Sequence, residues 1–153
     1  MSDLISFDNP VFSKFAFYSG IVLSKTMLMS GLIGHQRGKH KYPPPNPEDF
    51  KLLRIPVRDL NVTPNDTVER TRRCHRNDLE NVIPFVLIGL LYVTTNPDPT
   101  TAAWHFRIFT GFRIFHTFAY LMVLPRPSRG IGFLGGFLAT VSMAISVLKS
   151  TLY

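Results

Sequence analysis

The chain has 153 residues, enough for one domain, and its 17 lysines and arginines against 10 acidic residues give a net charge of +7. The basic residues flank apolar segments and no recognised nucleic-acid motif is present, which argues against nucleic acid and for anionic lipid headgroups as the partner. The one cysteine excludes an internal disulfide, and the 45% hydrophobic residues are gathered into four blocks.

The first block covers residues 11–35 and is interrupted by Lys14 and Lys25. A helix needs roughly 20 apolar residues to cross a bilayer, so this block is long enough to be a membrane span. A signal peptide is the alternative, but no basic segment precedes the block, which is also longer than a typical signal-peptide core. We therefore predict a retained span.

The connection over residues 36–67 is polar and rich in proline, so we expect no long helix or span there and at most a cap on the membrane surface. Its prolines are Pro43, Pro44, Pro45, Pro47, Pro56 and Pro64. Two glycosylation sequons begin at Asn61 and Asn65. A loop on the cytoplasmic side would not be glycosylated, so the sequons test the topology.

The second predicted span, residues 68–95, begins with charged residues that continue into an apolar helix without a break. Arg73, Arg76, Asn77 and Glu80 lie at i, i+3, i+4 and i+7 and therefore share one helix face. Internal pairing does not require this much positive charge, and arginine suits bidentate recognition of carboxylates. The pattern predicts a site for an anionic, peptide-like molecule, with Glu80 facing its amine.

The third predicted span, residues 101–124, carries a second polar stripe with the same spacing. It consists of Arg113, His116, Thr117 and Tyr120. The second span enters the membrane on the side to which the third returns, so Glu80 and Arg113 should both lie roughly 16 Å inside. The two stripes are therefore predicted to meet at one depth.

A structural role for some of these charges is an open alternative. Arg113 could pair with Glu80 or Asp78, and Lys25 with the remaining acid, so that the charges only hold helices together. For Asp78, Lys25 and Arg107 we leave packing and ligand binding as equal alternatives. Trp104 and Tyr92, which flank the turn before this span, are expected to anchor at the membrane interface.

The fourth predicted span, residues 128–150, has no charge between Gly130 and Leu148 and so lacks the polar face of a helix in a soluble four-helix bundle. Its small residues favour close helix packing in lipid, although the Gly135-Gly136 pair could mark a kink. We predict an all-α membrane protein, one four-helix transmembrane domain over residues 1–153. A channel would need a continuous polar path, which this span does not supply.

Positive charge is concentrated on one side of the predicted membrane domain. Ten of the 17 lysines and arginines lie between His35 and Glu80, and Arg126 and Arg129 follow in the next connection on that side. By the positive-inside rule this side faces the cytoplasm, and both termini are predicted to be lumenal.

Three motifs resemble one known family. They are E-R-x-R-R-x-H-x-N-D-x-E-N followed by I-P-F from Glu69, N-P-E-D at residues 46–49, and G-x-R-x-x-H-T-x-A-Y at residues 111–120. The chain resembles the membrane-associated proteins in eicosanoid and glutathione metabolism (MAPEG) over nearly its whole length. Within that family the pattern is most similar to type-1 microsomal glutathione transferases, and next to microsomal prostaglandin E synthases.

The resemblance implies a homotrimer of four-helix subunits that binds glutathione as cosubstrate on the cytoplasmic side, between neighbouring subunits. It implies a detoxifying transferase that conjugates the glutathione thiolate to hydrophobic electrophiles, with peroxidase activity on lipid hydroperoxides. Alternatives are a prostaglandin E synthase-like isomerase and a non-catalytic lipid-binding scaffold. The implied location is the endoplasmic reticulum membrane, with the outer mitochondrial membrane as a second candidate.

The resemblance also assigns residues. Arg129 corresponds to an arginine thought to stabilise the thiolate, with Asp49 assisting it. The glutathione-binding residues that the resemblance implies are Arg73, Asn77, Glu80, His116 and Tyr120, with Arg37 as a looser match, and the two polar stripes add Arg76 and Arg113 to the predicted set. Gly130 stands where the prostaglandin synthase has a serine, which weighs against the isomerase, and Phe50 stands where some relatives carry a cysteine. We predict no metal site.

Overall fold

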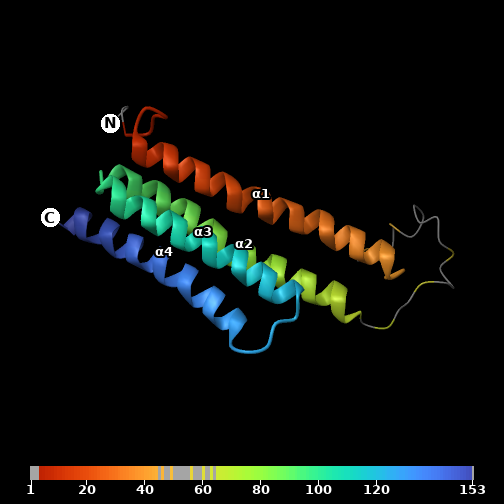
Figure 1. Cartoon of the computed structure of the whole chain (residues 1–153). Coiled ribbons are helices and arrows are strands. Elements are labelled where there is room, and N and C mark those ends of the chain that lie inside the picture. Colours follow the sequence, from red (N-terminus) through yellow and green to blue (C-terminus); the bar gives the residue numbers. More distant parts are fainter. Residues whose placement is uncertain are drawn as a thin grey trace.

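The computed structural model describes residues 4–44, 46, 49, 56, 60, 63 and 65–152. Four long helices form an elongated antiparallel bundle with both chain ends at one end of it (Figure 1). They are α1 (Pro10–Lys39), α2 (Asp66–Thr94), α3 (Pro99–Leu121) and α4 (Ser128–Leu152). The described part of the chain contains no strand, so the prediction of an all-α protein is confirmed. The Asn61 sequon and Phe50 lie outside the described residues.

Polar caps set where the first three helices begin. Asn9 caps α1 by accepting a hydrogen bond from the backbone N–H of Val11 at 2.9 Å, and proline follows at the first helical position. Asn65 caps α2 and Asp98 caps α3 in the same way. The backbone N–H and hydroxyl of Thr101 hold the pKa of the exposed Asp98 carboxyl below its ordinary value.

Stacked aromatic rings fill the half of the core nearer the termini. Phe85 of α2 lies face to face with Phe109 of α3, with ring centroids 3.7 Å apart, and Phe106 contacts both Phe85 and Phe15 of α1. Phe115 and Phe118, further along α3, are exposed instead. The phenylalanines of α3 thus serve both the core and the outer surface.

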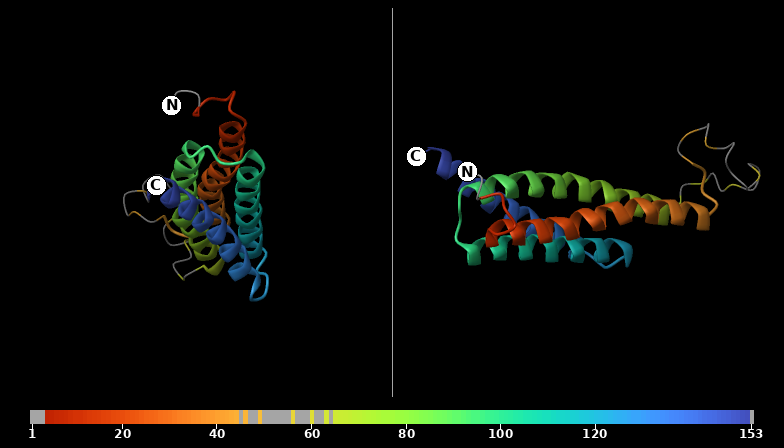
Figure 2. Two further views of the ribbon diagram at one scale, coloured as in Figure 1. Left: turned by 90° about the vertical axis from the view of Figure 1, so that its left-hand side faces the viewer. Right: turned by 90° about the horizontal axis from the view of Figure 1, so that it is seen from above.

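The outer surface of the bundle is apolar, which reverses the pattern of a soluble bundle. Large side chains such as Met27, Leu28, Leu87 and Leu138 are more than half exposed. Helices α1, α2 and α4 are long and apolar enough to cross a membrane. Helix α3, predicted as a span, does not reach that hydropathy because it carries charged and polar residues, yet it lies alongside α4 and α1 in the bundle (Figure 2).

Glycine lets α4 pack closely against α3. A Cβ atom on Gly132 would lie 2.9 Å from the Cα and Cβ of His116, and one on Gly136 would lie 3.2 Å from Cδ of Arg113. A Cβ on Gly135 would meet the ring of Phe112 at 2.5 Å. Helix α4 continues through these positions without interruption, so the glycines act in packing.

Replacing Gly132 with alanine should therefore lower the free energy of unfolding by about 1–3 kcal/mol, because the added methyl group meets backbone that cannot move aside. Gly111→Ala is the matched control: it lies on α3 with nothing within 4 Å of its Cβ position, and the same change should be neutral or stabilising by up to about 1 kcal/mol. The melting temperatures of the two variants are measured by thermal unfolding in the same detergent. Equal melting temperatures would contradict the close-packing role.

Candidate functional site

The stripe predicted on α2 lies on the outer side of the bundle. Arg73, Arg76 and Glu80 are exposed, and Asn77 is half-buried. Nε of Arg76 lies 3.9 Å from Oε1 of Glu80, and Arg73 lies 3.9 Å from the exposed carboxylate of Asp66. These long contacts leave both guanidinium groups free to bind an anion.

An open groove of about 460 Å³ runs beside this stripe. It is lined by Ile33 of α1 and by Glu69, Arg72, Arg73, His75, Arg76 and Leu79 of α2. Arg72 is paired with Glu69 at 2.8 Å, whereas Arg73 and Arg76 have no closer partner among the described residues. The groove is therefore basic. Sequence reasoning missed Arg72 as a lining residue, although positions 69, 72, 73 and 76 have helical spacing.

A second polar group lies where α3 ends and α4 begins. The guanidinium carbon of Arg129 lies 5.0 Å from the centroid of the Tyr120 ring, a cation–π contact that fixes the arginine. The ring of His116 lies 5.1 Å from that of Tyr120. Tyr120 and Arg129 line an open pocket of about 380 Å³ together with Arg126, Pro127 and Gly130. His116 is buried, and its Nδ1 has no hydrogen-bond partner in the described structure.

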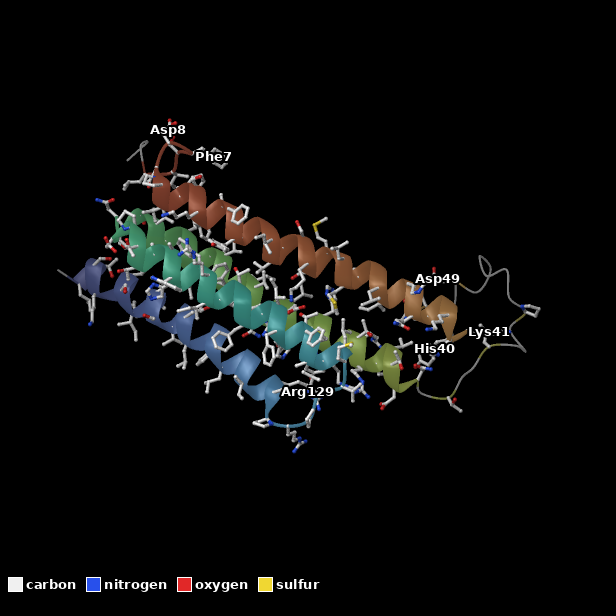
Figure 3. All side chains as sticks on the ribbon, in the orientation of Figure 1. Phe7, Asp8, His40, Lys41, Asp49 and Arg129 are labelled. Carbon is white, nitrogen blue, oxygen red and sulfur yellow. The ribbon has the colours of Figure 1, made fainter. Side chains whose placement is uncertain are left out.

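Asp49 and Arg37 lie at the C-terminal end of α1, at the end of the bundle away from the chain termini. Figure 3 shows Asp49 beside the end of α1 and Arg129 at the start of α4, well apart within one chain. Asp49 accepts a hydrogen bond from Asn46 at 3.2 Å. Arg37 is half-buried and lines a small pocket with Lys41, Tyr42 and Leu60, among others.

Asp78 forms the centre of a buried cluster of charges. Its Oδ1 accepts hydrogen bonds from Nζ of Lys25 at 2.6 Å and from Nη2 of Arg113 at 2.5 Å. Lys25 also donates to Thr117 at 2.7 Å. Arg113 thus pairs with Asp78, one of the two acids considered for it, and Lys25 shares that acid instead of taking the other.

Arg113 differs from the other predicted binding residues because it is fully buried inside the bundle. Its Nη2 also donates to Oδ1 of Asn77 at 3.0 Å. Arg113 thus ties the core cluster to the half-buried amide on α2 and can orient that amide. Arg107 takes no part in this cluster and donates to the hydroxyl of Tyr18 instead.

The stripe on α2 and the pocket at Arg129 are separate within one chain. Over the described residues, no hydrogen bond or ion pair joins Arg73, Arg76 or Glu80 to Tyr120 or Arg129. Each half is open to the surroundings. One half offers guanidinium groups and a carboxylate, and the other offers an arginine held over an aromatic ring.

Comparisons with known proteins find relatives over nearly the whole chain. The MAPEG family profile matches residues 15–149. The microsomal glutathione S-transferase 1 of Homo sapiens is 49% identical, in an alignment that covers 95% of this chain and 94% of the relative. That of Sus scrofa is 47% identical and covers 100% of this chain and 99% of the relative. The prostaglandin E synthase of Bos taurus is 32% identical over 96% and 94%.

Proposed function

The chain belongs to the MAPEG family of membrane proteins, and we propose that it is a membrane-bound glutathione transferase, which joins the sulfur of glutathione to hydrophobic electrophiles. The observation that carries this proposal is the exposed stripe on α2. Glutathione has two carboxylates and one ammonium group. Arg73 and Arg76 present guanidinium groups to the carboxylates, and Glu80 presents a carboxylate to the ammonium group.

Arg129 is the residue that we assign to the thiol. A guanidinium group beside a thiol favours the thiolate, which is the form that attacks. The thiolate sulfur forms a bond to an electrophilic carbon, and the leaving group departs with its electron pair. The cation–π contact with Tyr120 holds the guanidinium group in place, so it need not reorganise as the thiolate forms.

A second copy of the chain completes the site in this proposal. The α2 stripe and the Arg129 pocket do not meet within one chain, whereas a homotrimer can bring the stripe of one subunit against the Arg129 of its neighbour. Asp49 reaches Arg129 in the same way, from a neighbouring subunit. Arg37, His116 and Tyr120 complete the proposed binding set, with Arg113 positioning Asn77 from within the core.

All four helices cross the membrane in this proposal, including α3. Two of the charged or titratable side chains that lower its hydropathy, Arg113 and His116, are buried within the bundle. The membrane is that of the endoplasmic reticulum, with the mitochondrial outer membrane as a second location. The basic end of the bundle, opposite the termini, faces the cytoplasm.

The same site supports two further reactions. A thiolate open to the lipid phase can attack a lipid hydroperoxide that has partitioned into the bilayer: the O–O bond breaks, the lipid alcohol leaves after protonation, and a second glutathione converts the resulting sulfenic acid to glutathione disulfide and water. A prostaglandin E synthase-like isomerase is the second candidate function, favoured by the 32% identity to the Bos taurus enzyme. Gly130, which follows Arg129 where that enzyme class has a serine, weighs against it.

The direct test is conjugation of glutathione to a hydrophobic aryl halide by the purified protein in lipid vesicles. We expect thioether formation well above the rate in protein-free vesicles. Binding of glutathione without conjugation would contradict the transferase and favour the isomerase or a non-catalytic binder. Prostaglandin H isomerisation, measured on the same preparation, distinguishes the isomerase from the non-catalytic binder.

Replacing Glu80 with glutamine should weaken glutathione binding, because the ammonium group loses a charge-assisted partner. Such a contact is worth about 1.5–3 kcal/mol, so the dissociation constant should rise roughly 10- to 100-fold. Isothermal titration of the protein in detergent measures it. Asp98→Asn is the control, since it removes an acid at the other end of the bundle and keeps a capping side chain. An unchanged constant in Glu80→Gln would return Glu80 to a structural role.

A further inference from the structure

Arg107 is an exposed cation on the outer side of the membrane bundle. It lies eight residues after Pro99, the first residue of α3, and so about 12 Å along the helix from the end that holds the termini. Its Nε donates to the hydroxyl of Tyr18 on α1 at 3.1 Å, and its guanidinium carbon lies 5.5 Å from the centroid of the Trp104 ring. It forms no ion pair with any residue that the structure describes.

Two cations deeper in the bundle are held differently. Lys25 and Arg113 are turned inward and share the carboxylate of Asp78. Arg107 has two neutral contacts, a hydroxyl and a ring, which hold the guanidinium group without neutralising it. A charge at the edge of the hydrocarbon region is costly unless an opposite charge is near. The opposite charge must come from the surroundings.

The surroundings at this depth offer a phosphate. Tyr18 engages Nε and leaves the two terminal nitrogens of Arg107 available as a fork, the geometry that binds phosphate with two hydrogen bonds. An arginine side chain can extend along the helix toward the headgroup layer. Trp104, 55% exposed and one turn nearer the helix start, is of the residue type that marks this layer in membrane proteins.

We propose that Arg107, held by Tyr18 and Trp104, binds the phosphodiester group of a glycerophospholipid in the leaflet at the end of the bundle that holds the chain termini. The acyl chains of that lipid lie along the apolar surface between α1 and α3. The site rests on the placement of the chain in a membrane and does not depend on glutathione chemistry. It lies on the half of the bundle away from the basic groove.

Trp104 is the single tryptophan of the chain and contacts Arg107, so its fluorescence reports lipid at this site. The protein in dodecyl maltoside micelles, which contain no phosphate, is titrated with brominated phosphatidylcholine or with brominated diacylglycerol of the same acyl chains. We expect the phospholipid to reach half-quenching at a roughly tenfold lower mole fraction, the effect of about 1.4 kcal/mol. Equal quenching by the two lipids overturns the proposal, whether or not any variant folds.

Two variants locate the effect. Arg107→Leu should remove the difference between the two lipids, and Arg107→Lys should retain part of it. Lys149→Leu is the matched control, because Lys149 is an exposed cation near the same end of the bundle, on α4. A preference that survives Arg107→Leu overturns the proposal. A smaller oligomer mass for Arg107→Leu by light scattering, with no change in quenching, also overturns it and assigns Arg107 to a subunit contact.

Discussion

Alanine at Arg129 is expected to reduce conjugation at pH 7 by about 10- to 100-fold while glutathione remains bound. A free thiol has a pKa near 8.5, and we expect the guanidinium group to lower the pKa of the bound thiol by about one to two units. The lowered pKa raises the fraction of bound glutathione that is ionised to the thiolate at neutral pH. Loss of the guanidinium group should move the rise of activity with pH upward by the same roughly one to two pH units, so that the activities of wild type and variant converge at alkaline pH.

The measurement is a pH titration of thiolate absorbance for bound glutathione, together with the pH–rate profile. Lys39→Ala serves as the control, because Lys39 is an exposed cation in the last turn of α1, at the same end of the bundle, and lines neither the Arg129 pocket nor the groove on α2. An equal shift in the control would mean that the general positive field acts on the thiol. An unchanged titration in Arg129→Ala would remove its assigned role.

Asparagine at Asp78 is expected to destabilise the fold by about 3–5 kcal/mol, the usual cost of breaking a buried ion pair. Both Lys25 and Arg113 would remain in the bundle interior with no carboxylate between them. Thermal unfolding in detergent should show a large drop in melting temperature. The dissociation constant for glutathione should also rise, because Asn77 loses an oriented partner when Arg113 moves.

Asp66→Asn provides the comparison on the same helix. Its carboxylate pairs with Arg70 at 3.2 Å but is 84% exposed, so its loss should cost less than about 1 kcal/mol. Adding Lys25→Met to Asp78→Asn should recover part of the stability by removing one of the unpaired cations. Equal melting temperatures for Asp66→Asn and Asp78→Asn would show that the buried cluster contributes nothing specific.

The helices could be predicted because their limits depend on local chemistry. Asn9, Asn65 and Asp98 are capping residues; an apolar block follows Asn9 and Asp98 directly, and a charged stretch and then an apolar block follow Asn65. The limits of the helices differ from those of the predicted membrane spans. Helix α1 continues to Lys39, past the predicted limit at residue 35, because nothing in the intervening sequence stops a helix. Helix α3 ends at Leu121, whereas the predicted span extends to residue 124. Val123, two residues after the end of the helix, adopts a positive φ of 57°.

The candidate site was only partly predictable. Helical spacing predicts which side chains share a face of a helix, and the residues of the α2 stripe do lie on one face. It does not state which way a face points. Arg113 has the same spacing relative to Tyr120 as Arg73 has to Glu80, yet Arg113 points into the core and Arg73 away from it. That direction is decided by contacts with partners far away in the chain, such as the pairing of Asp78 with Lys25.

The pairing of Lys25 with Asp78 also bears on how the chain enters the bilayer during synthesis. The ribosome makes α1 before α2, so Lys25 emerges 53 residues ahead of the carboxylate that neutralises it. An unpaired lysine at the centre of a helix costs about 2.5–3.5 kcal/mol on insertion. The smallest segment that can settle in lipid with this lysine neutralised is therefore the hairpin of α1 and α2, rather than α1 alone.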